Sequence, residues 1–145
     1  MARTTLDTAA LAHDLRLAVM RFSRRLRNQR VDTSVTLTHL AALSTLKRHG
    51  AMSPGELAGH ERVQPPSMTR TVNCLVDEGY AVRRPHESDG RQVLVDITEK
   101  GREILLADRR RRDAWLAQRL RELTPDERAL LREAAPLIQR LATIS

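Results

Sequence analysis

Cysteine and aromatic residues are scarce in this 145-residue sequence. It has one cysteine, and one residue each of phenylalanine, tyrosine and tryptophan. A single cysteine excludes an intramolecular disulfide framework and a zinc site built from cysteines. Three aromatic side chains give little support for recognition of single-stranded nucleic acid by base stacking. The five histidines show no His-x-x-x-His spacing on one helix, so we expect no metal site.

Motifs of catalysis and long apolar runs are also missing. The sequence contains no glycine-rich phosphate loop, nucleophile elbow or paired-carboxylate motif, so we expect neither an enzyme nor a bound cofactor. No apolar run approaches the roughly 18 residues that span a bilayer, and the N-terminus lacks the apolar core of a signal peptide. These absences predict a cytoplasmic protein with no membrane partner.

Positive charge is the feature present in excess. Lysine and arginine number 25 against 18 aspartate and glutamate residues, which leaves a formal charge of +7 and a pI near 11.0. This balance is typical of proteins that bind nucleic acid or an anionic surface, although a merely soluble basic protein has it too. The length suits one domain with one core.

The central part of the chain predicts two short helices followed by a hairpin. A Ser-Pro-Gly-Glu motif at 53–56 combines a serine cap, a proline in the first turn and a capping-box glutamate. A second helix is expected from the Gln-Pro-Pro-Ser sequence at 64–67 to Gly79, since glycine favours a helix end. Strands at 80–84 and 91–97 would follow, around a polar tip. This order is typical of a winged helix-turn-helix.

Amphipathic helices precede this segment. Apolar residues at helical spacing predict a helix over 6–28, after a frayed tail at 1–5. A polar connection is expected over 30–35. The next helix would be capped by Thr36 or Thr38.

Two further helices follow the hairpin. Thr98 is expected to cap a long helix that continues to about Arg121, and Thr124 opens the last one with a Thr-Pro-x-Glu sequence. Pro136 lies inside this last helix and should bend or interrupt it. The run Arg109–Arg112 points around most of the helix circumference, so we interpret it as a solvated or partner-pairing surface rather than a DNA site.

The apolar stripes of the first helix and of the last two exceed what one small lobe can cover. A second subunit would cover them most simply through a two-fold symmetric interface, so we predict a homodimer. The expected fold is mainly α-helical with a small β-hairpin wing. We assign residues 6–29 and 124–145 to dimerisation helices, 36–97 to a winged-helix DNA-binding lobe, and 98–122 to a long connecting helix.

The helix predicted over 65–79 has a polar face suited to DNA. At 100° per residue, its apolar side chains share one arc of roughly 100°, and Arg70 points away from that arc. The apolar residues are Met68, Val72, Leu75 and Val76. The candidates for DNA contact are Pro66, Ser67, Thr69, Arg70 and Asn73. Arginine pairs with guanine and asparagine with adenine, although an ordinary surface helix would show the same pattern when taken alone.

The hairpin tip is the second candidate contact. Basic side chains crowd it, namely Arg83, Arg84, His86 and Arg91. An arginine at this place can enter a narrowed minor groove, where the negative potential is deepest. The wing candidates are Arg84, His86, Asp89 and Arg91. Asp89 is expected to brace the Arg91 guanidinium through a charge-assisted pair, and Ser53 to bind phosphate at its helix start. A solvated turn around Asp89-Gly90 is the alternative interpretation.

Cys74 falls at the margin of the DNA-facing helix. Its oxidation would disturb docking, so a redox switch is one interpretation. A small, half-buried filler is the interpretation that we favour.

Five short segments occur in a specific order and spacing: Ser53–Ala58, Pro66–Arg70, Leu75–Tyr80, Asp89–Arg91 and Ile97–Gly101. Together they resemble the MarR (multiple antibiotic resistance regulator) family of transcriptional regulators, over essentially the whole chain. The resemblance implies a homodimeric winged-helix repressor or activator whose recognition helices occupy successive major grooves. It also implies that Ser67, Thr69 and Arg70 lie near bases or phosphates, and that Asp89 and Arg91 form the wing pair.

Proteins of this family often release DNA when a small aromatic or phenolic ligand binds between their two lobes. The segments around that cleft, 13–20 and 37–46, contain no aromatic or distinctive polar cluster. We therefore expect a transcriptional repressor that binds double-stranded DNA as a homodimer and recognises an inverted repeat by its sequence. Release of the DNA on ligand binding is implied by the resemblance alone. The alternatives are a basic architectural DNA-binding protein with little sequence specificity, and a winged helix used for protein contacts.

Overall fold

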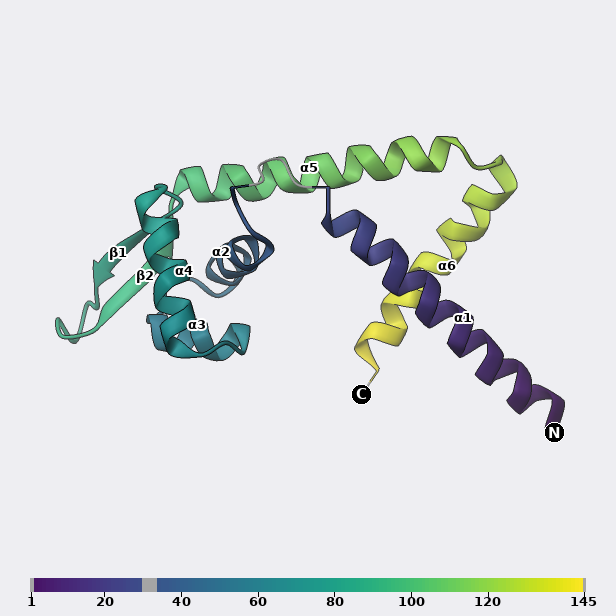
Figure 1. The fold of residues 1–145 in the computed structure, drawn as a ribbon, viewed down its shortest axis with the longest axis horizontal. Coiled ribbons are helices and arrows are strands. Elements are labelled where there is room, and N and C mark those ends of the chain that lie inside the picture. The colour runs from purple at the N-terminus through teal and green to yellow at the C-terminus, as the bar shows by residue number, and fades with distance from the viewer. Residues whose placement is uncertain (1, 30–33, 145) are drawn as a thin grey trace.

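The protein folds into two lobes joined by one long helix. The structure is a computed structural model that describes residues 2–29 and 34–144. In chain order its elements are α1 (Ala2–Arg27), α2 (Leu37–His49), α3 (Pro54–Glu61), α4 (Pro65–Asp77), β1 (Ala81–Pro85), β2 (Val93–Ile97), α5 (Glu99–Arg121) and α6 (Pro125–Thr143). Figure 1 shows α2, α3, α4 and the hairpin gathered at one end of α5, and α1 and α6 towards its other end.

Polar caps begin the helices at the places that the sequence predicts. Thr36 Oγ1 accepts a hydrogen bond from His39 N (3.2 Å) and His39 Nδ1 accepts one from Thr36 N (3.4 Å), so Thr36 rather than Thr38 caps α2. Burial lowers the pKa of His39, which favours the neutral ring whose Nδ1 can accept. Thr98 and Thr124 cap α5 and α6 as predicted.

Two predictions about helix extent were wrong. The tail expected to fray is helical, because α1 begins at Ala2 and nothing between Ala2 and Arg27 is a proline or a glycine that would stop it. The last helix continues through Pro136, so the predicted interruption is wrong and a bend there stays a prediction. A proline removes one donor from the helix, and at this exposed position water can satisfy the carbonyl left free. Of the connection expected over 30–35, residues 30–33 lie outside the described residues, and residues 34 and 35 form no helix or strand.

The first strand lies one residue later than the sequence predicted, and the second strand begins two residues later. β1 and β2 pair antiparallel with Ala81 opposite Ile97, and β2 adds a bridge to Met52 through Val95. Tyr80 does not begin the first strand, because its amide donates to Leu75 O (2.8 Å) and closes the end of α4. Residues 91 and 92 likewise belong to the tip rather than to the second strand.

The hydrophobic core lies in the lobe that contains α2, α3, α4 and the hairpin. Its largest fully buried side chains are Leu43, Leu46, Leu57, Met68, Leu75, Val72 and Val95. They come from α2, α3, α4 and β2; Ala81 of β1 and Leu105 of α5 are also buried in this core. This lobe therefore has a closed core of its own.

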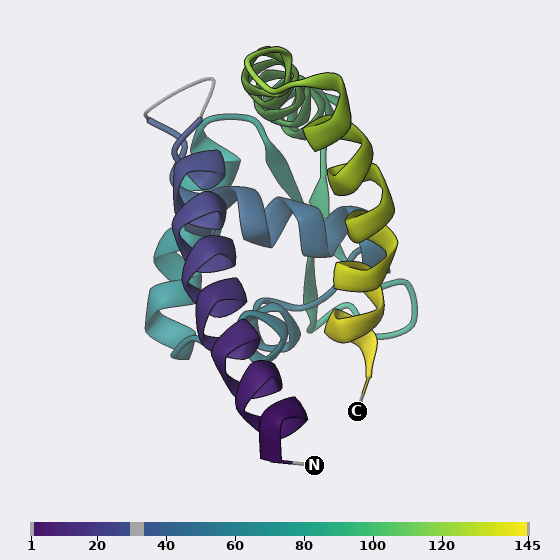
Figure 2. The ribbon, with the colours of Figure 1, turned by 90° about the vertical axis from the view of Figure 1, so that its right-hand side faces the viewer.

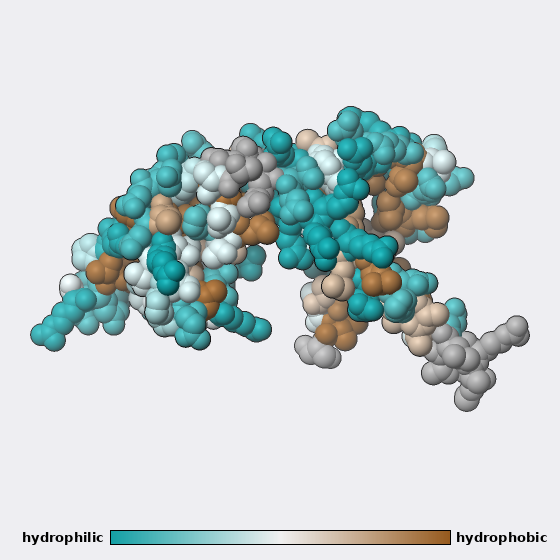
Figure 3. Space-filling view, viewed as in Figure 1, coloured by the Kyte–Doolittle hydropathy of each residue, from teal (hydrophilic) through white to brown (hydrophobic). Residues whose placement is uncertain are grey.

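The other lobe leaves its apolar side chains uncovered. Leu11 of α1 is 63% exposed and Leu141 of α6 is 60% exposed, and α6 contains no buried residue. One aromatic contact joins α1 to α5, where the rings of Phe22 and Trp115 lie 6.4 Å apart. Figure 3 shows the resulting hydrophobic patches on the surface of this lobe. Figure 2 shows α1 and α6 extending away from α5 on the same side.

Among the helices described, none combines the length and the apolar character needed to cross a membrane.

Replacement of Gly101 by alanine is expected to destabilise the protein by about 1–3 kcal/mol, the usual cost of overpacking. Gly101 is buried in the first turn of α5, where an added Cβ would collide with the Tyr80 carbonyl oxygen and lie 2.8 Å from Ile97 Cγ1. Both obstacles belong to the backbone or the core and cannot swing aside. Urea unfolding at matched protein concentrations measures the loss.

The matched control is Gly59→Ala in α3, where an added Cβ meets no atom within 4 Å. It is expected to be neutral or stabilising by up to about 1 kcal/mol, since alanine favours a helix. Equal midpoints for Gly101→Ala and the unchanged protein would contradict the proposed close contact.

Candidate nucleic-acid interface

The buried face of α4 decides which of its residues can reach a ligand. Met68, Val72 and Leu75 are at most 1% exposed, as predicted from their spacing. Val76 is only partly buried, and Thr71 takes the fourth place in the buried face at 8% exposure. Burial of Thr71 is tolerated because its hydroxyl donates to Ser67 O (3.1 Å). The hydrophobic arc could not reveal this, since it was built from apolar residues alone.

All five candidate residues of α4 are exposed: Pro66, Ser67, Thr69, Arg70 and Asn73. The Thr69 hydroxyl donates to Pro65 O (3.0 Å), which leaves its oxygen lone pairs and its methyl group to face outwards. Among the described residues, Arg70 forms no ion pair. The face therefore presents a free guanidinium, hydroxyl oxygens and an amide, which are the groups that contact base edges and phosphates.

A hydrogen bond links this face to the wing. The Arg83 guanidinium of β1 donates through Nη2 to Asn73 Oδ1. Sequence reasoning placed Arg83 in the basic cluster of the wing but missed its contact with α4. No local pattern reveals it, because the two residues belong to different elements whose packing brings them together.

Ser53 lies at the start of α3 and caps it, as the sequence predicts. Its Oγ accepts a hydrogen bond from Glu56 N (3.1 Å), and the side chain is half-buried. The hydroxyl keeps its own hydrogen as a donor. A phosphate contact from Ser53 stays a prediction.

His86 organises the tip of the wing. Its Nδ1 accepts hydrogen bonds from Ser88 N (3.2 Å) and Asp89 N (3.3 Å). The base of the tip is closed by His86 N donating to Gln92 O and by Gln92 N donating to Asp89 O, both at 3.0 Å. His86 therefore has a structural role in the wing in addition to its predicted place near DNA.

Asp89 contacts Arg91, but through the backbone amide of Arg91 instead of the expected guanidinium. Asp89 Oδ1 accepts from the backbone amide of Arg91 (3.1 Å), and both side chains are exposed. An aspartate commonly bonds the backbone two residues on in a turn. Asp89 thus fixes the backbone conformation at Arg91, and the Arg91 guanidinium takes no part in this contact.

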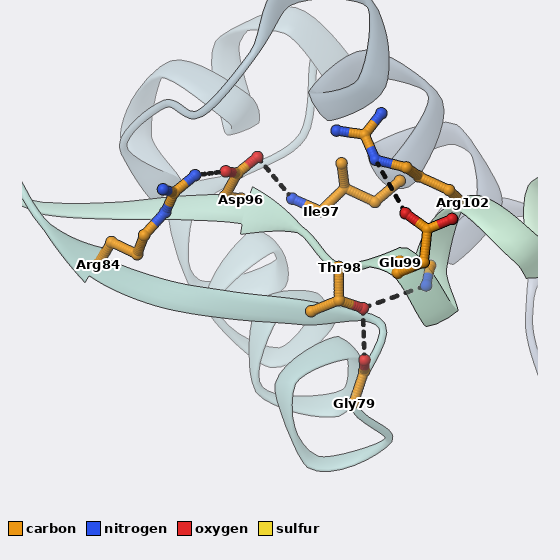
Figure 4. A network of polar contacts seen from close by, with 8 residues as sticks. Gly79, Arg84, Asp96, Ile97, Thr98, Glu99 and Arg102 are labelled. Atoms are coloured by element: carbon orange, nitrogen blue, oxygen red, sulfur yellow. Dashed lines mark hydrogen bonds and ion pairs between the residues drawn. The ribbon is translucent and has the colours of Figure 1, made fainter.

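Arg84 forms an ion pair with Asp96 across the hairpin. The side chain of Arg84 is 56% exposed and that of Asp96 is 16% exposed, so the pair lies at the surface. Asp96 also accepts from Ile97 N (2.8 Å), as Figure 4 shows. A DNA contact by Arg84 stays a prediction, and it would have to share the guanidinium with Asp96.

The junction of α4, the wing and α5 is fastened by polar contacts. The Thr98 hydroxyl donates to Gly79 O (2.6 Å) and accepts from Gly101 N (3.1 Å) (Figure 4). Lys100 Nζ donates to Glu78 O (2.6 Å) and lies 4.9 Å from the centre of the Tyr80 ring. These bonds hold the end of α4 against the start of α5, so the wing has a defined position beside α4.

Cys74 is exposed, so the half-buried filler was the wrong interpretation. It follows Arg70 by four residues and therefore shares its side of the helix. The helical projection placed Cys74 at the margin, and no neighbouring element covers that margin.

A basic cavity of about 290 Å³ lies between α2 and α5. Four cationic side chains, two leucines and one serine line it: Ser44, Lys47, Arg48, Leu105, Leu106, Arg109 and Arg112. Arg112 also forms an ion pair with the buried Asp108. Sequence reasoning placed the ligand cleft around residues 13–20 and 37–46, and of these Ser44 lines the cavity. It interpreted the arginine run as a solvated or partner-pairing surface, because it could not show that α5 packs beside α2.

Known proteins share this sequence and this geometry. The MarR family model matches residues 35–93. A helix-turn-helix (HTH) transcriptional regulator of Mycobacterium tuberculosis is 53% identical over 133 residues, which cover 92% of this chain and 93% of that protein. The multiple antibiotic resistance protein MarR of Salmonella typhimurium is 32% identical over 109 residues, covering 74% and 76% respectively. This chain belongs to the MarR family.

A solved structure of a transcriptional regulator shares this fold. A Pseudomonas aeruginosa protein solved as a candidate transcriptional regulator has a TM-score of 0.81 and 31% identity, over 96% of this chain and 97% of that one. The MarR-family chain described here is therefore a DNA-binding transcriptional regulator with a winged helix-turn-helix.

Replacement of His86 by alanine is expected to loosen the tip of the wing without unfolding the lobe. The amides of Ser88 and Asp89 would lose the acceptor that Nδ1 provides and would exchange faster with solvent. Hydrogen–deuterium exchange of the tip measures the change.

Glu87→Ala is the matched control, because Glu87 is the exposed neighbour of His86 in the same tip. Its exchange pattern is expected to equal that of the unchanged protein. Unaltered protection of residues 88 and 89 in the His86 variant would mean that the tip is held by other contacts.

Proposed function

We propose that this MarR-family regulator is a homodimeric repressor that binds an inverted-repeat sequence in double-stranded DNA. The observation that carries the proposal is the exposed polar face of α4, on which Arg70 has no ion pair with any described residue, and which has the wing beside it. The buried apolar face below it holds the helix in this rotation. A nonspecific basic protein would not need a polar face with such a defined position.

In the proposed complex, α4 lies in the major groove. Arg70 would donate to the O6 and N7 atoms of a guanine, the commonest specific contact of an arginine. Ser67 and Thr69 would reach bases or phosphates, and Pro66 would stand at the helix N-terminus, where phosphate is favoured. Ser53 would contact phosphate at the start of α3.

The wing would reach the neighbouring minor groove. Arg91 is exposed at the tip, and the bond from its amide to Asp89 shapes the backbone below it. A narrow minor groove attracts arginine through its negative potential. Arg84 and His86 would lie along the adjacent backbone of the DNA.

A second copy of the chain would cover the apolar surface of α1 and α6. The exposed apolar residues of α6 are Leu130, Leu131, Leu137, Ile138 and Leu141. Residues 6–29 and 124–145 are therefore proposed as dimerisation helices, 36–97 as the DNA-binding lobe and 98–122 as the connection. A two-fold dimer would present its recognition helices to half-sites about one helical turn apart, and a dimer bound over a promoter would exclude the polymerase.

Control by a small ligand belongs to the same proposal. The cavity between α2 and α5 is near the lower end of ligand-site volumes, and its four cations suit an acidic aromatic or phenolic molecule. Leu105 and Leu106 would contact the apolar part of such a ligand. Its binding would act on the junction between the two lobes, and so on the spacing of the recognition helices.

Replacement of Arg70 by alanine is expected to weaken specific binding by about 1–3 kcal/mol and to relax the preference at one base pair. Arg91→Ala is expected to weaken binding across sequences and to reduce the salt slope by about 1, because it removes one cation from the groove. Selection of bound sequences from random duplexes, followed by titrations at several salt concentrations, measures both effects.

The matched control is Arg110→Ala, which removes the same charge from an exposed position of α5. Its sequence preference is expected to be unchanged. If the unchanged protein bound the selected palindrome no better than random duplex, an architectural role would replace sequence-specific regulation. If it bound no duplex at all, the winged helix would serve protein contacts.

Replacement of Leu137 by glutamate is expected to shift the protein from dimer to monomer, because the charge would enter the apolar stripe of α6. Leu137 is 51% exposed in the single chain and lies on the same helix face as Leu130 and Leu141. Sedimentation velocity over a range of concentrations measures the shift. Gln139→Glu adds the same charge to the other side of α6 and should remain dimeric. A Leu137 variant that sediments as the dimer would contradict the assigned interface.

A further inference from the structure

The contact between Arg83 and Asn73 follows from the architecture of the hairpin. In β1 successive side chains point to opposite faces. Arg83 pairs with Val95, which is fully buried, so Arg83 starts on the face of the hairpin that packs against the core. Arg84, on the other face, forms the ion pair with Asp96. The two adjacent arginines therefore have different environments, and only Arg83 reaches α4.

The chemistry of the two groups decides how the Asn73 amide is oriented. A guanidinium has five N–H donors and no acceptor. The amide atom that faces it must therefore be the carbonyl oxygen, and Arg83 Nη2 donates to Asn73 Oδ1. The NH2 group of Asn73 then points away from Arg83. At an exposed position of α4, this leaves two N–H donors at the surface proposed to face the bases.

This orientation changes which base Asn73 can recognise. The usual bidentate pairing of asparagine with adenine needs both halves of the amide, with the oxygen accepting from N6 and the nitrogen donating to N7. In this protein one lone pair of the oxygen accepts from the Arg83 guanidinium, whose positive charge repels the donor group that would approach the other lone pair. The free NH2 group needs an acceptor, and guanine offers two in the major groove, O6 and N7.

We propose that Arg83 is a specificity-determining residue, which holds Asn73 as a hydrogen-bond donor and so directs it to guanine instead of adenine. The inference rests on the proposed function, because it requires α4 to lie in the major groove. It corrects the adenine pairing expected for Asn73 from its residue type alone. Arg83 acts on the base through Asn73, so it is a positioning residue in this readout.

The experiment selects bound sequences from random duplexes with the full-length protein and four variants. The unchanged protein is expected to enrich guanine at the base pair whose preference Asn73→Ala abolishes. Arg83→Met removes the N–H donors and keeps an apolar side chain. At the same base pair, this variant is expected to enrich adenine over guanine by about tenfold or more relative to the unchanged protein, which is the usual discrimination of one bidentate pair. Arg83→Lys keeps a donor and is expected to retain guanine. Thermal unfolding verifies that each variant is folded.

Arg91→Met is the matched control, since it removes an equal charge from the same wing. It is expected to weaken binding and to leave the preference at the Asn73 base pair unchanged. The salt dependence separates the proposed role from a phosphate contact. A readout through Asn73 leaves the salt slope of Arg83→Met close to that of the unchanged protein, whereas loss of a phosphate contact lowers it by about 1.

Three results would overturn the inference. Enrichment of adenine by the unchanged protein at the Asn73 base pair would show that the amide oxygen reaches the base. An Arg83→Met variant with uniformly weaker binding, a lower salt slope and an unchanged preference would make Arg83 a phosphate contact. Failure of the unchanged protein to enrich any sequence would remove the proposed function itself, and the inference with it; the first two results leave the proposed function standing.

Discussion

Burial of Met68, Val72 and Leu75 sets the rotation of α4, and the proposed DNA contacts depend on that rotation. The three side chains are at most 1% exposed. Full burial of side chains of this size contributes about 1.5–3 kcal/mol each, so any other rotation of the helix would cost several times the free energy of one base contact. The apolar face therefore places Arg70 and Asn73 outwards with little freedom to turn back.

The same lobe fastens its wing through short polar contacts. Thr98 bonds both Gly79 and Gly101, and Lys100 bonds Glu78, so the end of α4, the hairpin and the start of α5 meet at one junction. Gly101 allows the first turn of α5 to approach the backbone of Tyr80. Since α5 also leads to the second lobe, it connects the packing of α1 and α6 to α4, the proposed recognition helix.

The two lobes differ in how their apolar surface is covered. The lobe that contains α4 buries its large side chains within one chain, whereas α6 buries none of its own. A protein with this division can keep the lobe that contains α4 folded, while the contacts of α1 and α6 set the distance between two such lobes in a dimer. The basic cavity lies between α2, which belongs to the lobe of α4, and α5, which connects this lobe to α1 and α6. A ligand bound there would change the distance between the α4 helices of two subunits more readily than the exposed polar face of α4.

Much of this architecture could be predicted from the sequence because it depends on local rules. The caps at Thr36, Ser53, Thr98 and Thr124 involve residues three positions apart, and the buried arc of α4 follows from 3.6 residues per turn. The order of two short helices and a hairpin was predicted on the same basis. So was the polar face around Arg70, which rests on spacing within one helix.

Only the tertiary structure decided the contacts between elements. The bond from Arg83 to Asn73, the exposure of Cys74 and the basic cavity all depend on how separate elements pack, and packing is not encoded at any fixed spacing. The bond from the Arg91 amide to Asp89 is local, but the sequence equally allows Asp89 to pair with the Arg91 guanidinium. The geometry of the closed turn favours the amide. The sequence by itself determined that Arg70 and Asn73 face outwards on α4. The tertiary structure decided which of their atoms remain free to bind.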